Sequence, residues 1–442
     1  SSRISSTRSR SGGRDEGARP RFGRTVRFRL DSSWHRIGRR TVLGGSPIRR
    51  FEVTEAGARV IDGLEDGSSV EASHLIDRLL DAGAIHPRPT DEPARFRRVD
   101  VTVVTPQLGG TVRSDGRLTV DDGSEPPLAS AALRLSPNAG PATARNAGRR
   151  LVTTPLVAFV DHDVAAHPPV SATNNDSPPP DPFGWLDRLL PHFDDPRTGL
   201  VAPRVVGDPH SSLDLGTEPA RVRSCSRVSY VPAAAILVRI DAFDDIGGFD
   251  ERLRFGEDVD FVWRLDQAGW RCRYEPASAV WHEPRSTWRS RFLQQIGYGS
   301  SSAPLSLRHP HALAPWRGDA MVASFLATSC AGLPIVAGGI ALGHLERVRR
   351  RLSPVPAAAA YRLAMDSLVH GSCQFATAIR RTWWPIAFAA SFVSSRARRI
   401  TLVALLLGGR STPTDIAFGW GVWKGMIRLR TRRPIVPTLT RR

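Results

Sequence analysis

Lysine and cysteine are both scarce in this chain of 442 residues. Lys424 is the only lysine, so arginine carries almost all of the positive charge, and the formal net charge is +18 at pH 7. The four cysteines are widely separated and show no paired spacing, which argues against a disulfide framework and against a cysteine-rich metal site. We therefore expect reduced thiols in a cytosolic compartment.

The beginning of the sequence lacks the apolar core of a signal peptide. Residues 1–20 are rich in serine, arginine and glycine, and we expect a disordered leader there. A large positive charge attracts polyanions whatever the fold. However, the arginines are scattered along the chain and no base-reading motif is present, so the sequence does not predict nucleic acid as a partner.

Residues 21–90 have the pattern of a small α+β module, ending in a proline-rich linker. Thr54 is a good N-cap for one helix, and Gly83 is a good stop for the next. The expected elements are strands at 25–30, 48–53 and 84–86 and helices at 55–64 and 71–82. This outline is typical of a winged-helix module that binds peptide or nucleic acid, and a structural cap on the next domain is the alternative.

The sequence predicts three strands of a parallel sheet, which cover residues 99–105, 118–120 and 156–160, and aspartates follow the second and the third. Asp121 and Asp122 end the second strand, while Asp161 and Asp163 form a D-x-D after the third. Ligands of open α/β sheets bind at this edge. Two carboxylates there can hold a divalent cation, Mn²⁺ or Mg²⁺, together with diphosphate oxygens. For Asp121 and Asp122 an ordinary Asp-Gly-Ser turn is the alternative.

Two further segments add charged residues. Residues 140–148 predict a helix of small residues whose Arg145 can reach a phosphate, although a solvent-facing arginine is the alternative. A Phe-Gly turn precedes Glu257 and Asp258, which begin another predicted helix. Carboxylates at a helix N-terminus are stabilised by the helix dipole, so a simple first-turn acid pair is the alternative to a catalytic role.

These segments, VTVVTP, TVDDGS, GPATARNAG, FVDHDV and FGEDVDFVWRL, resemble in order and spacing the motifs of family 2 glycosyltransferases. The stretch RTVLGGSPIRRFEVTEAG in the leading module is further similar to the glycosyltransferases of the mycofactocin system. The resemblance implies a Rossmann-like nucleotide-sugar-binding domain of the GT-A type over residues 97–310. It also implies that the leading module recognises a peptide.

The resemblance implies roles for individual residues. Asp258 becomes the general base of an inverting transfer, in which a carboxylate takes the proton of the acceptor hydroxyl. Glu257 and Trp281 become candidates on the acceptor side, and His282 approaches the metal unless it is only a packed strand-end residue. The implied donor-binding residues are Pro106, Asp121, Asp122, Arg145 and Asp161, and the implied metal ligands are Asp161, Asp163 and His282.

The resemblance also implies the substrates. The donor would be a nucleotide-activated hexose, most simply UDP-glucose, and the acceptor a mycofactocin-type peptide-derived redox cofactor that receives β-linked sugars. A transferase building cell-envelope polysaccharide would share these motifs. The family's first crossover helix is replaced here by residues 107–117, which leaves open a peptide-binding scaffold that no longer binds the donor. The proline-rich insertion at 165–183 predicts a mobile loop near the metal.

The C-terminal part, residues 311–442, predicts apolar helices. Residues 320–345 carry no formal charge and are long enough to cross a bilayer, although a buried helix pair or an interfacial segment is the alternative. The apolar stretches 383–393 and 400–407 are separated by arginines, which suits an anionic membrane surface. We expect the protein at the cytoplasmic side of the cell membrane, either peripheral or with one or two transmembrane segments.

Overall fold

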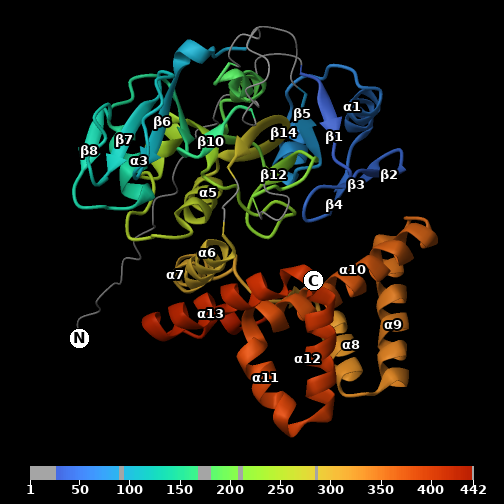
Figure 1. Cartoon of the computed structure of the whole chain (residues 1–442). Coiled ribbons are helices and arrows are strands. Elements are labelled where there is room, and N and C mark those ends of the chain that lie inside the picture. Colours follow the sequence, from blue (N-terminus) through green and yellow to red (C-terminus); the bar gives the residue numbers. More distant parts are fainter. Residues whose placement is uncertain (1–25, 89–93, 168–180, 208–212, 284–286, 441–442) are drawn as a thin grey trace, which may run out of the picture.

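The computed structural model describes residues 26–88, 94–167, 181–207, 213–283 and 287–440. The expected leader, most of the linker and the centre of the proline-rich insertion lie outside these residues. Figure 1 shows three parts in chain order: an N-terminal module, a central sheet with helices, and a group of C-terminal helices.

The N-terminal module is built from two short helices and two small sheets. Thr54 and Ser73 accept hydrogen bonds from the first turns of the helices, and Gly83 ends the second helix with φ +69°. The predicted helices are therefore present, and the hairpin β2–β3 was not predicted. The elements are β1 (Phe28–Leu30), β2 (His35–Gly38), β3 (Thr41–Gly44), β4 (Arg49–Glu52), α1 (Glu55–Glu65), α2 (His74–Ala82) and β5 (Ile85–Pro87).

Within the described residues, the central sheet has nine strands in the order β10-β14-β11-β13-β9-β6-β7-β8, with β12 beside β14. The strands are β6 (Val101–Gln107), β7 (Leu118–Asp122), β8 (Leu133–Leu135), β9 (Leu156–Val160), β10 (Val164–Ala165), β11 (Thr198–Val206), β12 (Ala220–Val222), β13 (Ala235–Arg239) and β14 (Arg271–His282). Strands β6, β7 and β9 are the three predicted strands, and they pair in parallel. Antiparallel β13 makes the sheet mixed.

The short connection between β6 and β7 does not prevent their parallel pairing. Gln107 lies opposite Asp121, so both strands deliver their ends to the same edge. The Gln107 side chain donates to the carbonyl oxygens of Gly109 and Thr111, and the Gly109 amide donates to the Ser124 hydroxyl at 2.8 Å. The connection turns without a helix because these bonds fold it onto the end of β7.

Helices cover the two faces of the sheet unequally. Helices α3 (Pro141–Arg149), α4 (Ile240–Asp245) and α5 (Glu257–Gln267) contribute to the core on one face, and η2 (Gly184–Arg188) and η3 (Leu190–Asp194) to the core on the other. Both η2 and η3 are 3₁₀ turns rather than α-helices. Pro191 lies at the start of η3 and supplies no backbone N–H, so an α-helix cannot run through this segment.

Helices follow the sheet up to the C-terminal end of the described residues. Helices α6 (Trp288–Ser300) and α7 (Ser302–Arg308) come before residue 311, and the C-terminal part contains α8 (Ala320–Cys330), α9 (Pro334–Leu352), α10 (Ala357–Ala378), the π-helix η4 (Ile379–Trp383), α11 (Trp384–Val393), α12 (Ser395–Gly408) and α13 (Thr412–Leu429). The stretch 320–345 is not one helix, because Gly332, with φ +73°, and Pro334 separate α8 from α9. Across the described ranges, none of the helices combines the length and the apolar character that a membrane span requires.

Helices α6 and α13 approach each other through glycines. A Cβ added at Gly299 would overlap the carbonyl oxygen of Phe418, and one added at Gly421 would overlap that of Ile296. We expect Gly299→Ala to lower the free energy of unfolding by about 1–3 kcal/mol, because the helices must move apart.

Gly338→Ala is the control, since Gly338 lies inside α9 with open space where its Cβ would be. This variant should gain about 0.5–1 kcal/mol from helix propensity. Urea denaturation measures both changes, and a Gly299→Ala variant as stable as Gly338→Ala would contradict the close approach.

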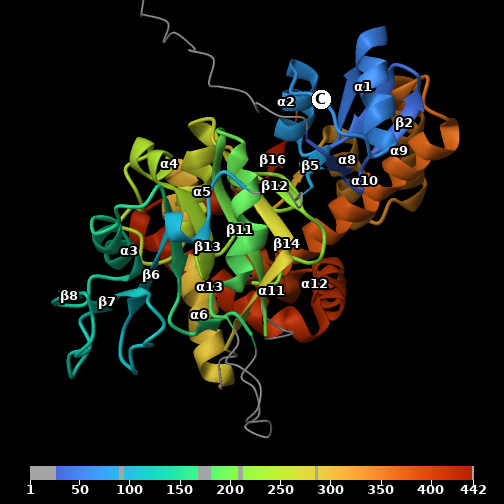
Figure 2. The same ribbon diagram turned by 90° about the horizontal axis from the view of Figure 1, so that it is seen from above.

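The N-terminal module packs against both other parts. Arg271 of β14 donates to Asp77 and Asp81 of α2 at 2.7 and 2.8 Å. On another side, Leu43 of β3 shares a buried apolar cluster with Val355, which lies between α9 and α10, and with Ala360 of α10. Figures 1 and 2 show the module beside these helices at one end of the sheet. The module is therefore an integral part of the structure.

Candidate functional site

The D-x-D motif lies where β9 ends, and it meets the end of β14. The Val164 amide donates to the Asp161 carbonyl oxygen, and the chain then pairs as β10 with β14, Val164 opposite His282. This pairing brings His282 Nε2 within 3.5 Å of Asp163 Oδ2, with both side chains partly exposed. The structure thus places together two of the three residues predicted as metal ligands.

Arg145 of α3 lies between the D-x-D motif and helix α5. Its side chain is 3% exposed, and its guanidinium group donates to Asp161 Oδ1 at 2.7 Å and to Glu257 Oε1 at 3.1 Å. The ring of Phe249 lies 5.4 Å from the guanidinium carbon. Contact of Arg145 with a diphosphate stays a prediction. The geometry gives Arg145 a second task, which is to hold the two carboxylates at one place.

Glu257 and Asp258 begin α5 after Gly256, as predicted. Gly256 has φ +76° and no room for a side chain, because a Cβ there would lie 2.9 Å from Ser301 and Leu305. Burial and the charge of Asp258 raise the pKa of Glu257 to about 7, against the opposing charge of Arg145. Burial also raises the pKa of Asp258, although the backbone N–H groups of Val259 and Ala233 and the charge of Arg145 lower it.

The raised carboxyl pKa values predict an unusual pH dependence. If Asp258 accepts a proton during catalysis, kcat should rise with pH through an acidic limb above the ordinary aspartate value of 3.8, because burial raises the pKa of Asp258. Stability should respond in the opposite direction. A carboxyl group whose pKa is raised on folding stabilises the protein below its ordinary pKa, and this contribution is lost as pH rises through about 7. Single-turnover rates and urea denaturation across this range test both signs, and a limb near pH 4 would contradict them.

Asp121 is fully buried at the end of β7. Its carboxylate accepts hydrogen bonds from the amides of Ser124 and Leu128 at 2.8 and 3.1 Å. Burial raises the pKa of Asp121, but a hydrogen bond with the Ser124 side chain and these two amide bonds lower it overall. Pro106 of β6 lies opposite Val120, at the same edge of the sheet. Asp121 therefore holds the turn, and its contact with a nucleoside stays a prediction, as does that of Pro106.

Asp122 fixes the start of α3. Its carboxylate accepts hydrogen bonds from the Asn138 side chain and from the amides of Ala139 and Gly140, at 2.8 to 3.3 Å. These bonds agree with the turn interpretation of the motif, because the carboxylates of both aspartates accept hydrogen bonds from within residues 122–140. A donor-binding role of Asp122 also stays a prediction.

Two features near the predicted base were not anticipated. Tyr230, in the segment between β12 and β13, has a pKa raised by burial and by the charge of Asp258, which indicates that it lies near the predicted base. Asp260 of α5 is fully buried and ties this helix to the end of α7. Burial alone would raise its pKa, but hydrogen bonds from His309 and Arg308 lower it to about 2. Neither segment carries a motif that predicts these contacts.

Trp281 of β14 is half-buried beside His282, opposite Ala165 and Val206. Its role on the acceptor side stays a prediction. Glu257 is the other acceptor-side candidate, and its side chain is 11% exposed and bonded to Arg145.

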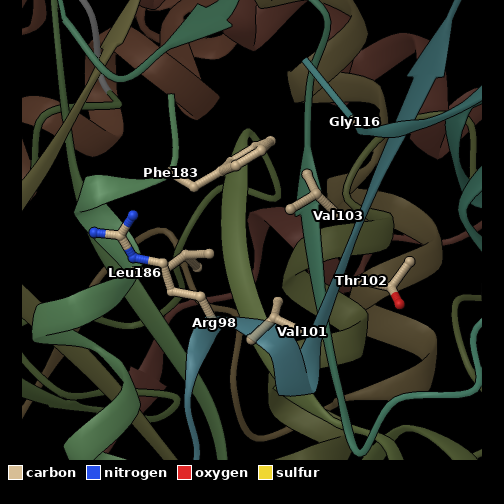
Figure 3. Close-up of a pocket in the computed structure, with 7 residues that line it drawn as sticks. All are labelled: Arg98, Val101, Thr102, Val103, Gly116, Phe183 and Leu186. Atoms are coloured by element: carbon tan, nitrogen blue, oxygen red, sulfur yellow. The ribbon is translucent and has the colours of Figure 1, made fainter. Parts of the chain in front are cut away.

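A pocket of about 300 Å³ lies away from these acids (Figure 3). Its lining comes from the beginning of β6, from Gly116 and from the segment of η2, namely Arg98, Val101, Thr102, Val103, Gly116, Phe183 and Leu186. The connection between β6 and β7 contributes Gly116 to the lining. The pocket lies at the beginning of β6 and is not the predicted donor site at the other end of that strand.

The comparisons with known proteins agree with the geometry. A profile of the family described as glycosyltransferase like family 2 matches residues 94–296. The chain is 35% identical over 463 residues to the pre-mycofactocin glycosyltransferase of Mycobacterium tuberculosis, covering 90% of this chain and 94% of that protein. The chain belongs to glycosyltransferase family 2. The predicted enzyme class is thereby confirmed, together with the GT-A-like mixed α/β sheet.

Other relatives of this transferase are similar over shorter stretches. The N-acetylglucosaminyl-diphospho-decaprenol L-rhamnosyltransferase of Mycobacterium tuberculosis is 45% identical over 56 residues, 12% of this chain and 18% of that protein. Among solved structures, the mannosyltransferase PcManGT from Pyrobaculum calidifontis, in complex with GDP-Man and Mn²⁺, has a TM-score of 0.42 and 13% identity, over 78% of this chain and 90% of that one.

Proposed function

We propose that this transferase moves glucose from UDP-glucose onto a mycofactocin-type peptide-derived redox cofactor, with inversion at the anomeric carbon. The observation that supports this chemistry is the group of carboxylates that Arg145 holds together. It places Glu257 and Asp258, at the start of α5, beside Asp161 at the ligand edge of the sheet. A carboxylate base next to a strand-end acid cluster is the arrangement that a single-displacement sugar transfer needs.

Asp258 is the proposed base. It takes the proton of the acceptor hydroxyl while that oxygen attacks the anomeric carbon, and the bond to the diphosphate breaks on the opposite side of the sugar. The raised pKa of Asp258 makes it a stronger proton acceptor than an ordinary aspartate. The guanidinium group of Arg145 pairs with both Glu257 and Asp161. Its positive charge offsets the repulsion between these carboxylates and keeps them close to the base.

The residues present fit a metal shared with the nucleotide rather than a closed protein cage. Within the described ranges, no group of three or more His, Cys, Asp or Glu side chains is gathered closely enough to hold an ion. Asp163 and His282 are neighbours and partly exposed, while one oxygen of Asp161 is bonded to Arg145. Mg²⁺ and Mn²⁺ accept few protein ligands when substrate phosphates complete their shell. When bound, such a cation supplies charge neutralisation for the departing diphosphate.

The reach of the similarity supports the proposed acceptor. The relative named pre-mycofactocin glycosyltransferase aligns with 90% of this chain, which is more than residues 97–442 alone could supply, so the alignment extends into the N-terminal module. By contrast, the succinoglycan biosynthesis protein ExoA of Rhizobium meliloti aligns with only 16% of this chain. We infer that the module, as a winged-helix-like unit, binds the peptide-derived part of the acceptor, which a polysaccharide synthase does not require.

Calorimetric titration with UDP-glucose, with and without Mn²⁺, tests the donor site. Binding should require the metal and should weaken at least about tenfold in Asp163→Asn and in His282→Asn, as expected for removal of one ligand. Asp62→Asn is the control, because Asp62 is a half-exposed partner of Arg36 within the N-terminal module.

The same proteins should then be assayed with the peptide-derived acceptor, with the product anomer assigned by NMR. Binding of no nucleotide sugar would overturn the enzyme mechanism and favour the scaffold alternative. Transfer to a polysaccharide primer but not to the peptide-derived acceptor would overturn the proposed acceptor alone.

A further inference from the structure

Helices α11 and α12 form a hairpin whose outward surface is apolar. On α11, Phe388, Phe392 and Val393 are 59%, 74% and 88% exposed. On α12, the exposed residues recur in pairs at helical spacing, so they form one continuous face of that helix. In the middle of that face are Leu402, Val403, Leu406 and Leu407, which are 53% to 79% exposed. An ordinary surface helix has the opposite arrangement, with its apolar stripe turned to the core.

The inner side of the hairpin is packed, so this exposure is a property of a folded element. Ala404 of α12 is 2% exposed and shares an apolar cluster with Ile379. Arg380 donates to the Ala404 carbonyl oxygen at 2.8 Å, and Thr401 donates to the Ala397 carbonyl oxygen within α12. Figure 1 shows the hairpin projecting from the C-terminal helices at the end of the molecule away from the central sheet.

Positive charge borders the apolar surface and negative charge is absent from it. Arg396, Arg398 and Arg399 are exposed in the first turns of α12, and Arg410 is exposed just after its end. Residues 384–410 contain these four arginines and no aspartate or glutamate. An apolar band with arginines at both ends matches the interface of an anionic bilayer, where acyl chains lie beside phosphate groups.

We propose that this hairpin face, made of the exposed residues of 386–410, docks the transferase on a membrane surface rich in anionic phospholipid. The two helices would lie in the plane of the interface, with Phe392, Val393 and Leu406 among the acyl chains and the arginines at the phosphates. The apolar part of α12 lies between Arg399 and Arg410, which is about half of the roughly 20 residues needed to cross the hydrocarbon. The attachment is therefore peripheral.

A second copy of the chain fits this face less well than a bilayer does. A two-fold interface places the same patch on both partners, so the four arginines of each copy would approach those of the other without intervening acids. Phosphate headgroups supply the missing negative charge. The proposal does not depend on the identity of the donor or the acceptor.

Vesicle co-sedimentation of the whole chain tests the docking face. The protein should bind vesicles that contain phosphatidylglycerol, bind phosphatidylcholine vesicles weakly, and dissociate as salt is added. The Leu402→Ser, Leu406→Ser double variant should bind at least about tenfold more weakly, because it removes two apolar side chains from the interface. Arg398→Gln and Arg399→Gln should each cost about fivefold, and only with anionic vesicles.

The control is the Leu307→Ser, Leu439→Ser double variant, whose side chains are 44% and 60% exposed outside the hairpin. Circular dichroism and UDP-glucose binding should be unchanged in all variants, which separates lost docking from lost folding. Equal vesicle binding by the hairpin variant and the control would overturn the proposal. Dimers in solution that only the hairpin variant loses, with no vesicle binding by the parent chain, would show a protein interface instead.

Discussion

Replacing Asp258 by asparagine is expected to lower kcat for sugar transfer by about 10²–10⁴-fold, the usual contribution of a general base. Asparagine keeps the shape of the side chain and can still accept a hydrogen bond from the Val259 amide, so helix α5 should begin as before. It cannot take the acceptor proton. UDP-glucose should bind with little change, because Arg145 bonds to Asp161 and Glu257 and not to Asp258.

Asp244→Asn is the matched control, since Asp244 is a half-exposed aspartate whose partner is Arg149 on the surface. Its kcat should remain within about twofold of the parent enzyme, as for a surface substitution. An Asp258→Asn enzyme that keeps more than a tenth of its kcat would exclude Asp258 as the base. Glu257→Gln should then be assayed next, because the pKa of Glu257 near 7 makes it the other group suited to proton transfer.

Replacing Arg271 by methionine is expected to lower the free energy of unfolding by about 3–5 kcal/mol, the cost of leaving buried partners of an ion pair uncompensated. The Arg271 side chain is 1% exposed, and it donates to Asp77, Asp81 and Asp195 at 2.7 to 2.9 Å. Asp195 is 2% exposed and would lose its closest cation. Because two of these partners lie on α2, the variant should also loosen the N-terminal module from the sheet.

Arg39→Met is the control for this prediction. Arg39 pairs with Glu55 within the module, and both side chains are more than half exposed. Its loss should cost less than about 1 kcal/mol, as for other surface pairs. Urea denaturation measures both variants, and limited proteolysis reports release of the module. Equal stability of the two variants would show that the buried ion pairs do not hold the module in place.

Short-range features of the chain were sufficient for much of the fold. Continuous apolar runs predicted β6, β7 and β9, and Thr54 and Gly83 marked helix ends that the structure confirms. The order and spacing of five motifs predicted the family. Their polar residues follow strands or begin helices, and these positions meet at one edge of a parallel sheet. Segments without such local patterns were missed, among them the short strands that pair with β14.

Contacts between distant residues depended on the packing of whole elements. His282 meets Asp163 because β10 pairs with the end of β14, and Arg145 joins Asp161 to Glu257 because α3 and α5 cover the same face of the sheet. Local propensity acts within a few residues, whereas strand pairing and buried charge depend on which elements come together. The apolar surface of α12 also depends on the packing of whole elements. The sequence shows its leucines and arginines, but only the packed hairpin shows which of them face outward.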